Sequence, residues 1–137
     1  MIVDTSVAVA ILRGEREGRS FAEIMELGTG GLTPGARLKM SVASYVETGV
    51  VMDAARNPVV SRQLDELIRI AGIELRPVTV EQARLAREAY RDFGRGSGHP
   101  AKLNVGDCYA YALAKELGEA LLFQGAGLGE TDVEAAV

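Results

Sequence analysis

The chain has 137 residues, of which 47% are hydrophobic and 25% are charged, and its 19 acidic and 15 basic residues give a formal net charge of -4. A chain of this length buries about two-thirds of the surface that its unfolded form exposes, so one core can form without disulfides or a structural metal. The composition excludes a disordered or collagen-like chain, and the acidic balance argues against a protein that coats nucleic acid through general basicity.

Residues that form disulfides or zinc sites are scarce. Cys108 is the only cysteine and His99 the only histidine, so neither an intramolecular disulfide nor a zinc cluster can form, and we expect Cys108 to pack as a small hydrophobic residue. The N-terminal segment has no basic leader, and its apolar stretch is shorter than the roughly 20 residues that a membrane-spanning helix needs. We therefore expect a cytoplasmic protein without a membrane segment.

Short apolar runs alternate with helical patterns in the N-terminal half. The predicted elements are a strand at 2–3, helices at 7–12 and 21–28, a loop at 28–34, a strand at 37–40, a helix from 41 that Asn57 and Pro58 end, and a helix at 64–71. Thr5 and Ser6 can cap the first helix, and Ser41 the third. In that third helix, Ala43, Val46, Val50 and Ala54 are predicted to line the buried face.

The same alternation continues to the C-terminus. The predicted elements are a strand at 73–78, a helix that Thr79 and Gln82 cap and that continues to Phe93, a flexible loop at 94–100, a helix at 105–117 between Asn104 and Gly118, and a strand at 120–123. Apolar strands that alternate with amphipathic helices indicate a parallel sheet covered on both faces. We therefore predict one α/β domain of three layers, with a central parallel sheet of four to five strands.

Asp4 is the first candidate functional residue. It stands where the first predicted strand passes into a helix, and in an open parallel sheet ligands bind beyond the carboxyl ends of the strands. The alternative is that Asp4 caps the helix, but Thr5 and Ser6 already offer two capping hydroxyls. We therefore favour a functional carboxylate, which must be paired, hydrated in a crevice or bound to a cation.

Glu47 and Asp107 are two further candidates. Glu47 follows Ala43 by four residues and precedes Val50 by three, so its carboxylate lies on the predicted apolar face, although a long stem that reaches water fits the same spacing. Asp107 lies three residues after Asn104, which is also typical of a helix-capping acid. Spacing alone leaves both interpretations of each residue open.

Sheet topology can bring Asp4, Glu47 and Asp107 to one crevice, where their charges repel unless a cation lies between them. Mg²⁺ prefers such hard oxygen ligands and is commonly held by one or two carboxylates. A bound Mg²⁺ polarises a phosphoryl oxygen and lowers the pKa of bound water, which suits phosphodiester hydrolysis. A phosphatase with Asp4 as nucleophile is a weaker alternative, because such a site needs a second acid where Ser6 stands.

Three segments resemble the motifs of PIN-domain ribonucleases of the VapC type, the toxins of bacterial toxin-antitoxin pairs. They are MIVDTSVAVAIL, SVASYVETGVV and HPAKLNVGDCYAYALAKELGEALLF, which carry Asp4, Glu47 and Asp107. The resemblance implies one PIN domain over residues 1–137, in which these acids bind Mg²⁺ or Mn²⁺. It also implies an endoribonuclease for structured RNA such as tRNA or rRNA, which forms a homodimer and is silenced by a VapB-type antitoxin.

The supporting residues of the same motifs are Thr5, Ser6 and Asn104. The chain departs from the family pattern after the last predicted strand, where relatives carry two acids after a glycine and this chain has Ala126 and Gly127. A fourth acid is therefore missing, and Glu130 or Asp132 is a candidate substitute. One alternative is thus a degenerate PIN domain that binds RNA or antitoxin with weakened or lost catalysis.

The loop between the last two predicted helices is rich in glycine and basic residues. It gathers Arg91, Arg95, His99 and Lys102, which can approach an RNA phosphate. A solvated linker is the simpler interpretation. His99 is too isolated in the sequence to be nominated as a general base.

Overall fold

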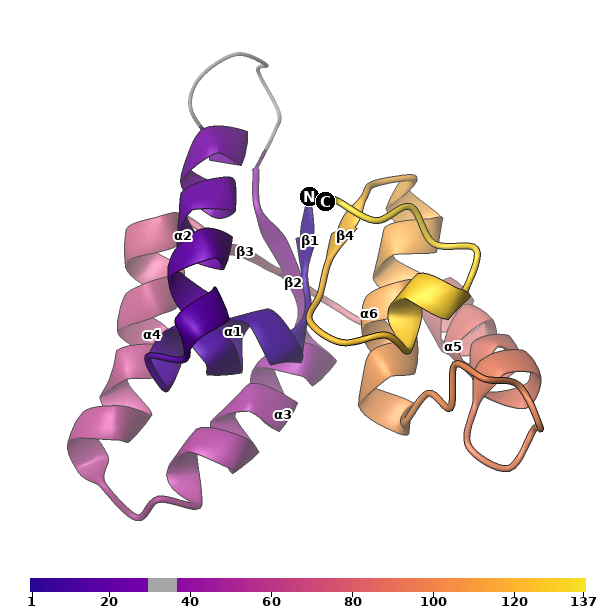
Figure 1. Ribbon diagram of the computed structural model, residues 1–137, viewed down its shortest axis with the longest axis horizontal. Helices are drawn as coiled ribbons and strands as arrows, with labels where there is room; N and C mark the ends of the chain where they lie inside the picture. Colours follow the sequence, from indigo (N-terminus) through magenta and orange to yellow (C-terminus); the bar gives the residue numbers. More distant parts are fainter. Residues whose placement is uncertain (30–36) are drawn as a thin grey trace.

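Four parallel strands form the sheet of the computed structural model, which describes residues 1–29 and 37–137 (Figure 1). The strands are β1 (Ile2–Val3), β2 (Lys39–Ser41), β3 (Glu74–Arg76) and β4 (Leu121–Leu122), in the order β3-β2-β1-β4. Ile2 of β1 pairs with Lys39 of β2 and with Leu121 of β4. The loop predicted at 28–34 lies largely outside the described residues.

Six α-helices of the described residues flank this sheet. They are α1 (Thr5–Leu12), α2 (Arg16–Thr29), α3 (Val42–Asp53), α4 (Pro58–Ala71), α5 (Val80–Phe93) and α6 (Val105–Leu117), and a short 3-10 helix, η1, follows at Leu128–Glu130. Figure 1 shows α1, α2 and α4 on one side of the strands and α5 and α6 on the other. Within residues 1–29 and 37–137, none of these helices has the length and apolar character that crossing a membrane requires.

Neighbouring residues of each strand serve opposite faces of the sheet. Ile2 and Leu121 join the core formed with α5 and α6, whereas Val3 and Leu122 join the core formed with α1 and α2. All four side chains are at most 1% exposed. This alternation follows from the two-residue period of a strand, and it explains why such short apolar runs suffice to separate two cores. The predicted three-layer α/β fold is confirmed.

The buried face of α3 differs from the predicted one. Val46 and Val50 are 61% and 66% exposed, while Ser44, Thr48 and Met52 are buried. The hydroxyl of Thr48 donates to the carbonyl of Ser44 at 2.8 Å, so its burial leaves no hydroxyl donor unpaired. The prediction from hydrophobic periodicity is therefore wrong about the buried face: Thr48 is buried with its hydroxyl bonded to its own helix, and Ser44 is buried although its hydroxyl has no hydrogen-bond partner in the described residues.

The helix predicted at 64–71 begins earlier, as α4. Asn57 caps it by accepting a hydrogen bond from the backbone N–H of Val59 at 3.0 Å, and Pro58 occupies its first turn. Asn57 and Pro58 thus begin this helix, although the sequence was interpreted to end the preceding one there. Both roles suit a proline, which disfavours helix before it and fits the first helical position after it.

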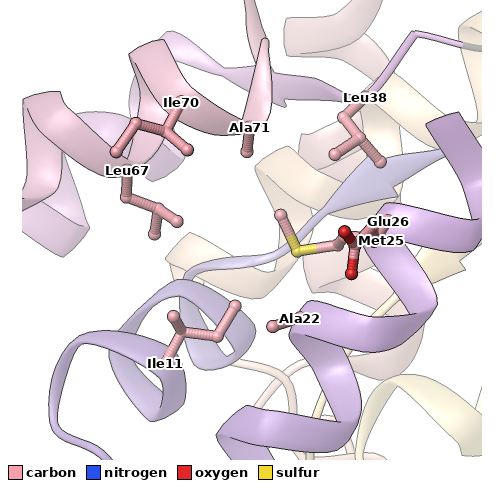
Figure 2. Close-up of a pocket in the computed structure, with 8 residues that line it drawn as sticks. All are labelled: Ile11, Ala22, Met25, Glu26, Leu38, Leu67, Ile70 and Ala71. Atoms are coloured by element: carbon pink, nitrogen blue, oxygen red, sulfur yellow. The ribbon is translucent and has the colours of Figure 1, made fainter.

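An apolar cavity of about 290 Å³ lies between α1, α2 and α4. Figure 2 shows the side chains of Ile11, Met25, Leu67 and Ile70 around it. Ile70 is 70% exposed, so an apolar side chain at the edge of the cavity faces solvent.

Candidate active site

Asp4 directly follows β1 and is the N-cap of α1. Its Oδ2 accepts hydrogen bonds from the backbone N–H of Ser6 at 3.0 Å and from the Ser6 hydroxyl at 2.6 Å. The prediction that Thr5 or Ser6 caps this helix is therefore wrong, because Asp4 does so itself. Only one of the two carboxylate oxygens of Asp4 forms hydrogen bonds. Asp4 is 3% exposed, and its buried Oδ1 has no hydrogen-bond partner in the described part of the chain.

The charge of Asp4 is unfavourable in this position. Burial raises its pKa from 3.8 to about 6, against the effect of the Ser6 hydrogen bonds, and the charges of Asp107 and Glu47 raise it further. A buried carboxylate oxygen without a partner is expensive to ionise. The fold thus brings Asp4, Glu47 and Asp107 near enough to interact electrostatically, although they come from three separate helices or their caps.

Glu47 approaches this group across the contact between α3 and α6. It is half-buried, and its carboxylate lies against Gly106, where a Cβ atom would overlap it. Gly106 therefore gives the carboxylate its place beside Asp107. The role of Gly106 was not predicted from the sequence. A glycine inside a helix lowers helix stability by up to about 1 kcal/mol relative to alanine, so its presence there was the signal of a close contact.

Asp107 lies in the first turn of α6 and forms a capping box with Asn104, as the spacing predicts. Its Oδ2 accepts from the backbone N–H of Asn104 at 2.9 Å, and its own N–H donates to Asn104 Oδ1 at 2.8 Å. Burial raises the pKa of Asp107, and the Asn104 bond and the Arg95 charge oppose that rise.

Cys108 is 2% exposed, and burial raises its pKa to about 11, so it remains a neutral thiol.

Asp4 and Asp107 thus have similar roles at their helices. In each, one carboxylate oxygen accepts hydrogen bonds at a helix N-terminus, and the other oxygen accepts none in the described structure. Within residues 1–29 and 37–137, no group of three or more His, Cys, Asp and Glu side chains is arranged to hold a metal ion. The unpaired Asp4 Oδ1 nevertheless fits a cation, because it is a hard, buried oxygen donor beside two further carboxylates. A donor set of carboxylates alone suits Mg²⁺ or Mn²⁺ better than zinc.

The turn after β4 lies against the same group of residues. The backbone N–H of Gln124 donates to the Ser6 hydroxyl at 2.9 Å, so Ser6 bonds to both Asp4 and this turn. Ala126 is exposed, whereas a Cβ atom at Gly127 would lie 2.8 Å from the carbonyl oxygen of Ala101. An acid is therefore sterically feasible at position 126 and needs backbone movement at position 127.

Neither candidate substitute for the missing acid is bound to this group of residues. Asp132 accepts hydrogen bonds from the hydroxyl of Tyr111 at 2.6 Å and from the ammonium group of Lys115 at 3.1 Å, which hold it on α6. Glu130 lies exposed in η1.

Comparisons with known proteins agree with this fold and with the sequence motifs. Residues 1–134 match the PIN domain model. The chain is 51% identical over 137 residues to Ribonuclease VapC28 and 46% identical over 136 residues to Ribonuclease VapC42, both from Mycobacterium tuberculosis, and it covers 98% of each. The chain therefore belongs to the PIN-domain family. Within that family its full-length relatives are VapC ribonucleases, as the three motifs predict.

Solved structures show the same fold at low sequence identity. Mycobacterium tuberculosis VapC20, described as a Sarcin-Ricin loop cleaving toxin, aligns with a TM-score of 0.71 at 14% identity, over 96% of this chain and 95% of that one. A toxin-antitoxin complex from Klebsiella pneumoniae aligns with a TM-score of 0.61 at 14% identity, over 91% of this chain and 86% of that one.

Proposed function

We propose that the protein is the toxin of a type II toxin-antitoxin system and a metal-dependent endoribonuclease that cuts structured RNA such as tRNA or rRNA. In this proposal Asp4, Glu47 and Asp107 bind Mg²⁺ or Mn²⁺. The observation that carries it is the buried, unpartnered Oδ1 of Asp4, whose pKa the charges of the other two acids also raise.

Each residue has a defined part in this proposal. Asp4 offers Oδ1 to the metal while the Ser6 bonds hold Oδ2, and Asp107 offers the oxygen that does not cap α6. Packing on Gly106 holds Glu47 beside them. When bound, a divalent ion polarises a phosphoryl oxygen and lowers the pKa of coordinated water. Thr5 supports the site by donating its hydroxyl to the carbonyl of Ser44 at 3.2 Å, which joins α1 to α3.

Cleavage of a structured RNA by the purified protein tests this proposal. We expect cutting with Mg²⁺ or Mn²⁺, no cutting in EDTA, and a loss of at least about 100-fold in Asp4→Asn. Asp53→Asn is the matched control, because Asp53 is an exposed acid at the end of α3. Cutting that continues both in EDTA and in Asp4→Asn would exclude the proposed site.

A second candidate function is a degenerate PIN domain that binds RNA or antitoxin with weakened catalysis. Ala126 and Gly127 favour it, because they stand where the family pattern that this sequence resembles has acids. The exposed position of Ala126 makes Ala126→Asp the informative variant, since Gly127→Asp would press on the backbone of Ala101. If catalysis is attenuated, Ala126→Asp raises the cleavage rate sharply; an unchanged rate counts against attenuation.

The partner in this proposal is a VapB-type antitoxin, and the protein acts in the cytoplasm. The apolar cavity between α1, α2 and α4 supports a protein partner (Figure 2). We expect Ile70→Asp at its exposed edge to weaken the complex with a VapB-type antitoxin, measured by co-purification. An unchanged complex would place the antitoxin elsewhere.

We also propose a homodimer, which the exposed valines Val46 and Val50 on α3 support. Sedimentation of the isolated protein tests this. We expect a dimer that Val50→Asp converts to a monomer, because a charge in an apolar interface costs more than the contact provides. A wild-type monomer at all concentrations would contradict the proposal.

A further inference from the structure

Residues 94–103, here called the basic loop, join α5 to the end of α6 that carries Asp107 (Figure 1). The two ends of the loop are held together. The backbone N–H of Arg95 donates to the carbonyl of Leu103 at 3.0 Å, and the N–H of Leu103 donates to the carbonyl of Phe93 at 2.9 Å. The segment is therefore a closed loop on the protein surface, and residues 95–98, 100 and 102 are exposed to solvent in it.

Hydrogen bonds also order the interior of the basic loop. The Ser97 hydroxyl donates to the carbonyl of Gly94 at 2.6 Å and accepts from the backbone N–H of His99 at 3.2 Å. His99 Nδ1 accepts from the N–H of Ala101 at 3.1 Å, and its ring meets that of Phe93 edge-on at 4.9 Å. In a neutral His99 the proton is consequently on Nε2, which is left as a hydrogen-bond donor.

The basic loop surrounds a cavity of about 460 Å³, lined by Arg95, Gly96, Gly98, His99, Pro100 and Lys102. Two of these residues are cationic and none is acidic. In the part of the chain that the structure describes, neither Arg95 nor Lys102 forms an ion pair. The backbone N–H groups of Gly96 and Gly98, both at φ +85°, make no hydrogen bonds there either. Unpaired cations and backbone N–H groups are the donors that bind phosphate.

Lys102 occupies a conformation that a lysine rarely adopts. Its φ is +48°, in the left-handed region that glycine and asparagine enter at less cost, and its side chain is exposed. Strained residues concentrate at functional sites, because the strain persists only where something else requires the residue. The exposed side chain of Lys102 is not required for packing, so its positive charge is the remaining reason for a lysine at this position.

We propose that the basic loop binds a backbone phosphate of the RNA next to the acidic site, with Arg95 and Lys102 as charge contacts and His99 Nε2 as a hydrogen-bond donor. This inference rests on the proposed ribonuclease function. The loop borders the acids, because it ends at Leu103, directly before Asn104, whose backbone N–H donates to Asp107 Oδ2 at 2.9 Å. Because the net charge of the chain is -4, its attraction for RNA depends on local cations and not on its overall charge.

The test compares two double variants that remove the same charge. Arg95→Gln/Lys102→Gly changes the loop, and Arg19→Gln/Arg56→Gly is the control, because Arg56 is also an exposed residue in the left-handed region, at φ 53°. Arg19 is exposed and forms no ion pair in the described part of the chain. Both glycine substitutions relieve backbone strain, so the folded state is expected to survive in each.

Binding is measured without cleavage, by fluorescence anisotropy of a short fluorescein-labelled RNA hairpin in EDTA over a series of KCl concentrations. We expect the loop variant to bind on the order of tenfold more weakly, with a slope of log K against log[KCl] smaller by about 1.4, or about 0.7 for each lost contact to single-stranded phosphate. The control should stay within about twofold of the wild type, because its cations lie elsewhere.

Equal affinity and slope in the loop variant and the control overturn the inference, and so does an equal loss in both. If thermal denaturation shows the double variant unfolded, Lys102→Gly alone decides by the same criteria, with an expected slope change of about 0.7. RNA cleavage by the wild type is measured separately, to distinguish failure of the proposed function from failure of the loop inference. No cleavage together with loop-dependent binding refutes the proposed function alone, and cleavage with loop-independent binding refutes the loop inference alone.

Discussion

Asp4→Asn is expected to make the metal-free protein more stable at neutral pH while it abolishes cleavage. The charged Asp4 is 3% exposed and its Oδ1 has no partner in the described structure, so ionisation opposes folding. A rise in pKa from 3.8 to about 6 corresponds to about 3 kcal/mol, at about 1.4 kcal/mol per pKa unit. We expect a net gain of about 2 kcal/mol, because the new amide N–H groups lose hydration at the position of Oδ1.

The pH dependence has a definite sign. The pKa of Asp4 is higher in the folded protein than in the unfolded chain, so its contribution to stability is greatest below pH 3.8 and is lost as the pH rises through about 6. Asn does not titrate. The stability advantage of Asp4→Asn is therefore largest above pH 7 and shrinks as the pH falls towards 4.

Thermal denaturation in EDTA between pH 4 and 8, at constant ionic strength, measures this difference. A gain of about 2 kcal/mol raises the Tm of a domain of this size by roughly 6–10 °C. A lower Tm for Asp4→Asn at pH 8, or a difference that does not change with pH, would refute the argument that buried charge destabilises this site.

Three further predictions follow from the contacts described. Gly106→Ala should abolish cleavage while leaving Tm unchanged or higher, because the new Cβ displaces the Glu47 carboxylate and alanine favours the helix; a cleavage rate equal to that of the wild type would contradict this. Ser6→Ala should lower the free energy of unfolding in urea by about 1–2 kcal/mol and raise the pKa of Asp4, because the hydrogen bonds of the Ser6 hydroxyl with Asp4 and Gln124 are lost. An unchanged free energy of unfolding would contradict a stabilising role for these two hydrogen bonds. Glu119→Gln should reduce stability more at pH 7 than at pH 3, because hydrogen bonds from Lys39 and the amino terminus hold the Glu119 pKa below its usual value despite burial. A Tm difference between variant and wild type that is the same at both pH values would exclude this.

The sheet and its flanking helices were predictable because their signals are local. Ser41 caps α3 by accepting from the N–H of Ala43 at 3.2 Å, and Asn104 caps α6, both as expected from residue type. Gly118 ends α6 at φ 64°, which few other residues adopt. Each of these features depends on a few neighbouring residues, so a pattern in the sequence is enough to indicate it.

Features that depend on contact between distant segments were not predictable. The buried face of α3 is decided by what packs on it, and Thr5 of α1 bonds to the carbonyl of Ser44 at 3.2 Å. The role of Gly106 depends on a side chain from another helix. The candidate acids were found because acids at strand ends and in helix first turns are conspicuous, and their assignment as metal ligands stays a prediction.

The hydrogen bond between Ser6 and Gln124 joins residues 118 positions apart. Strand β1 lies between β2 and β4, so the first strand to be synthesised receives its second neighbour only when almost the whole chain is available. Asp4 likewise meets Asp107 only after α6 has formed. Because domains fold as units during synthesis, a growing chain holds its acids apart from one another. The three acids of the proposed site therefore come together only near the end of synthesis, once α6 and the turn after β4 are available.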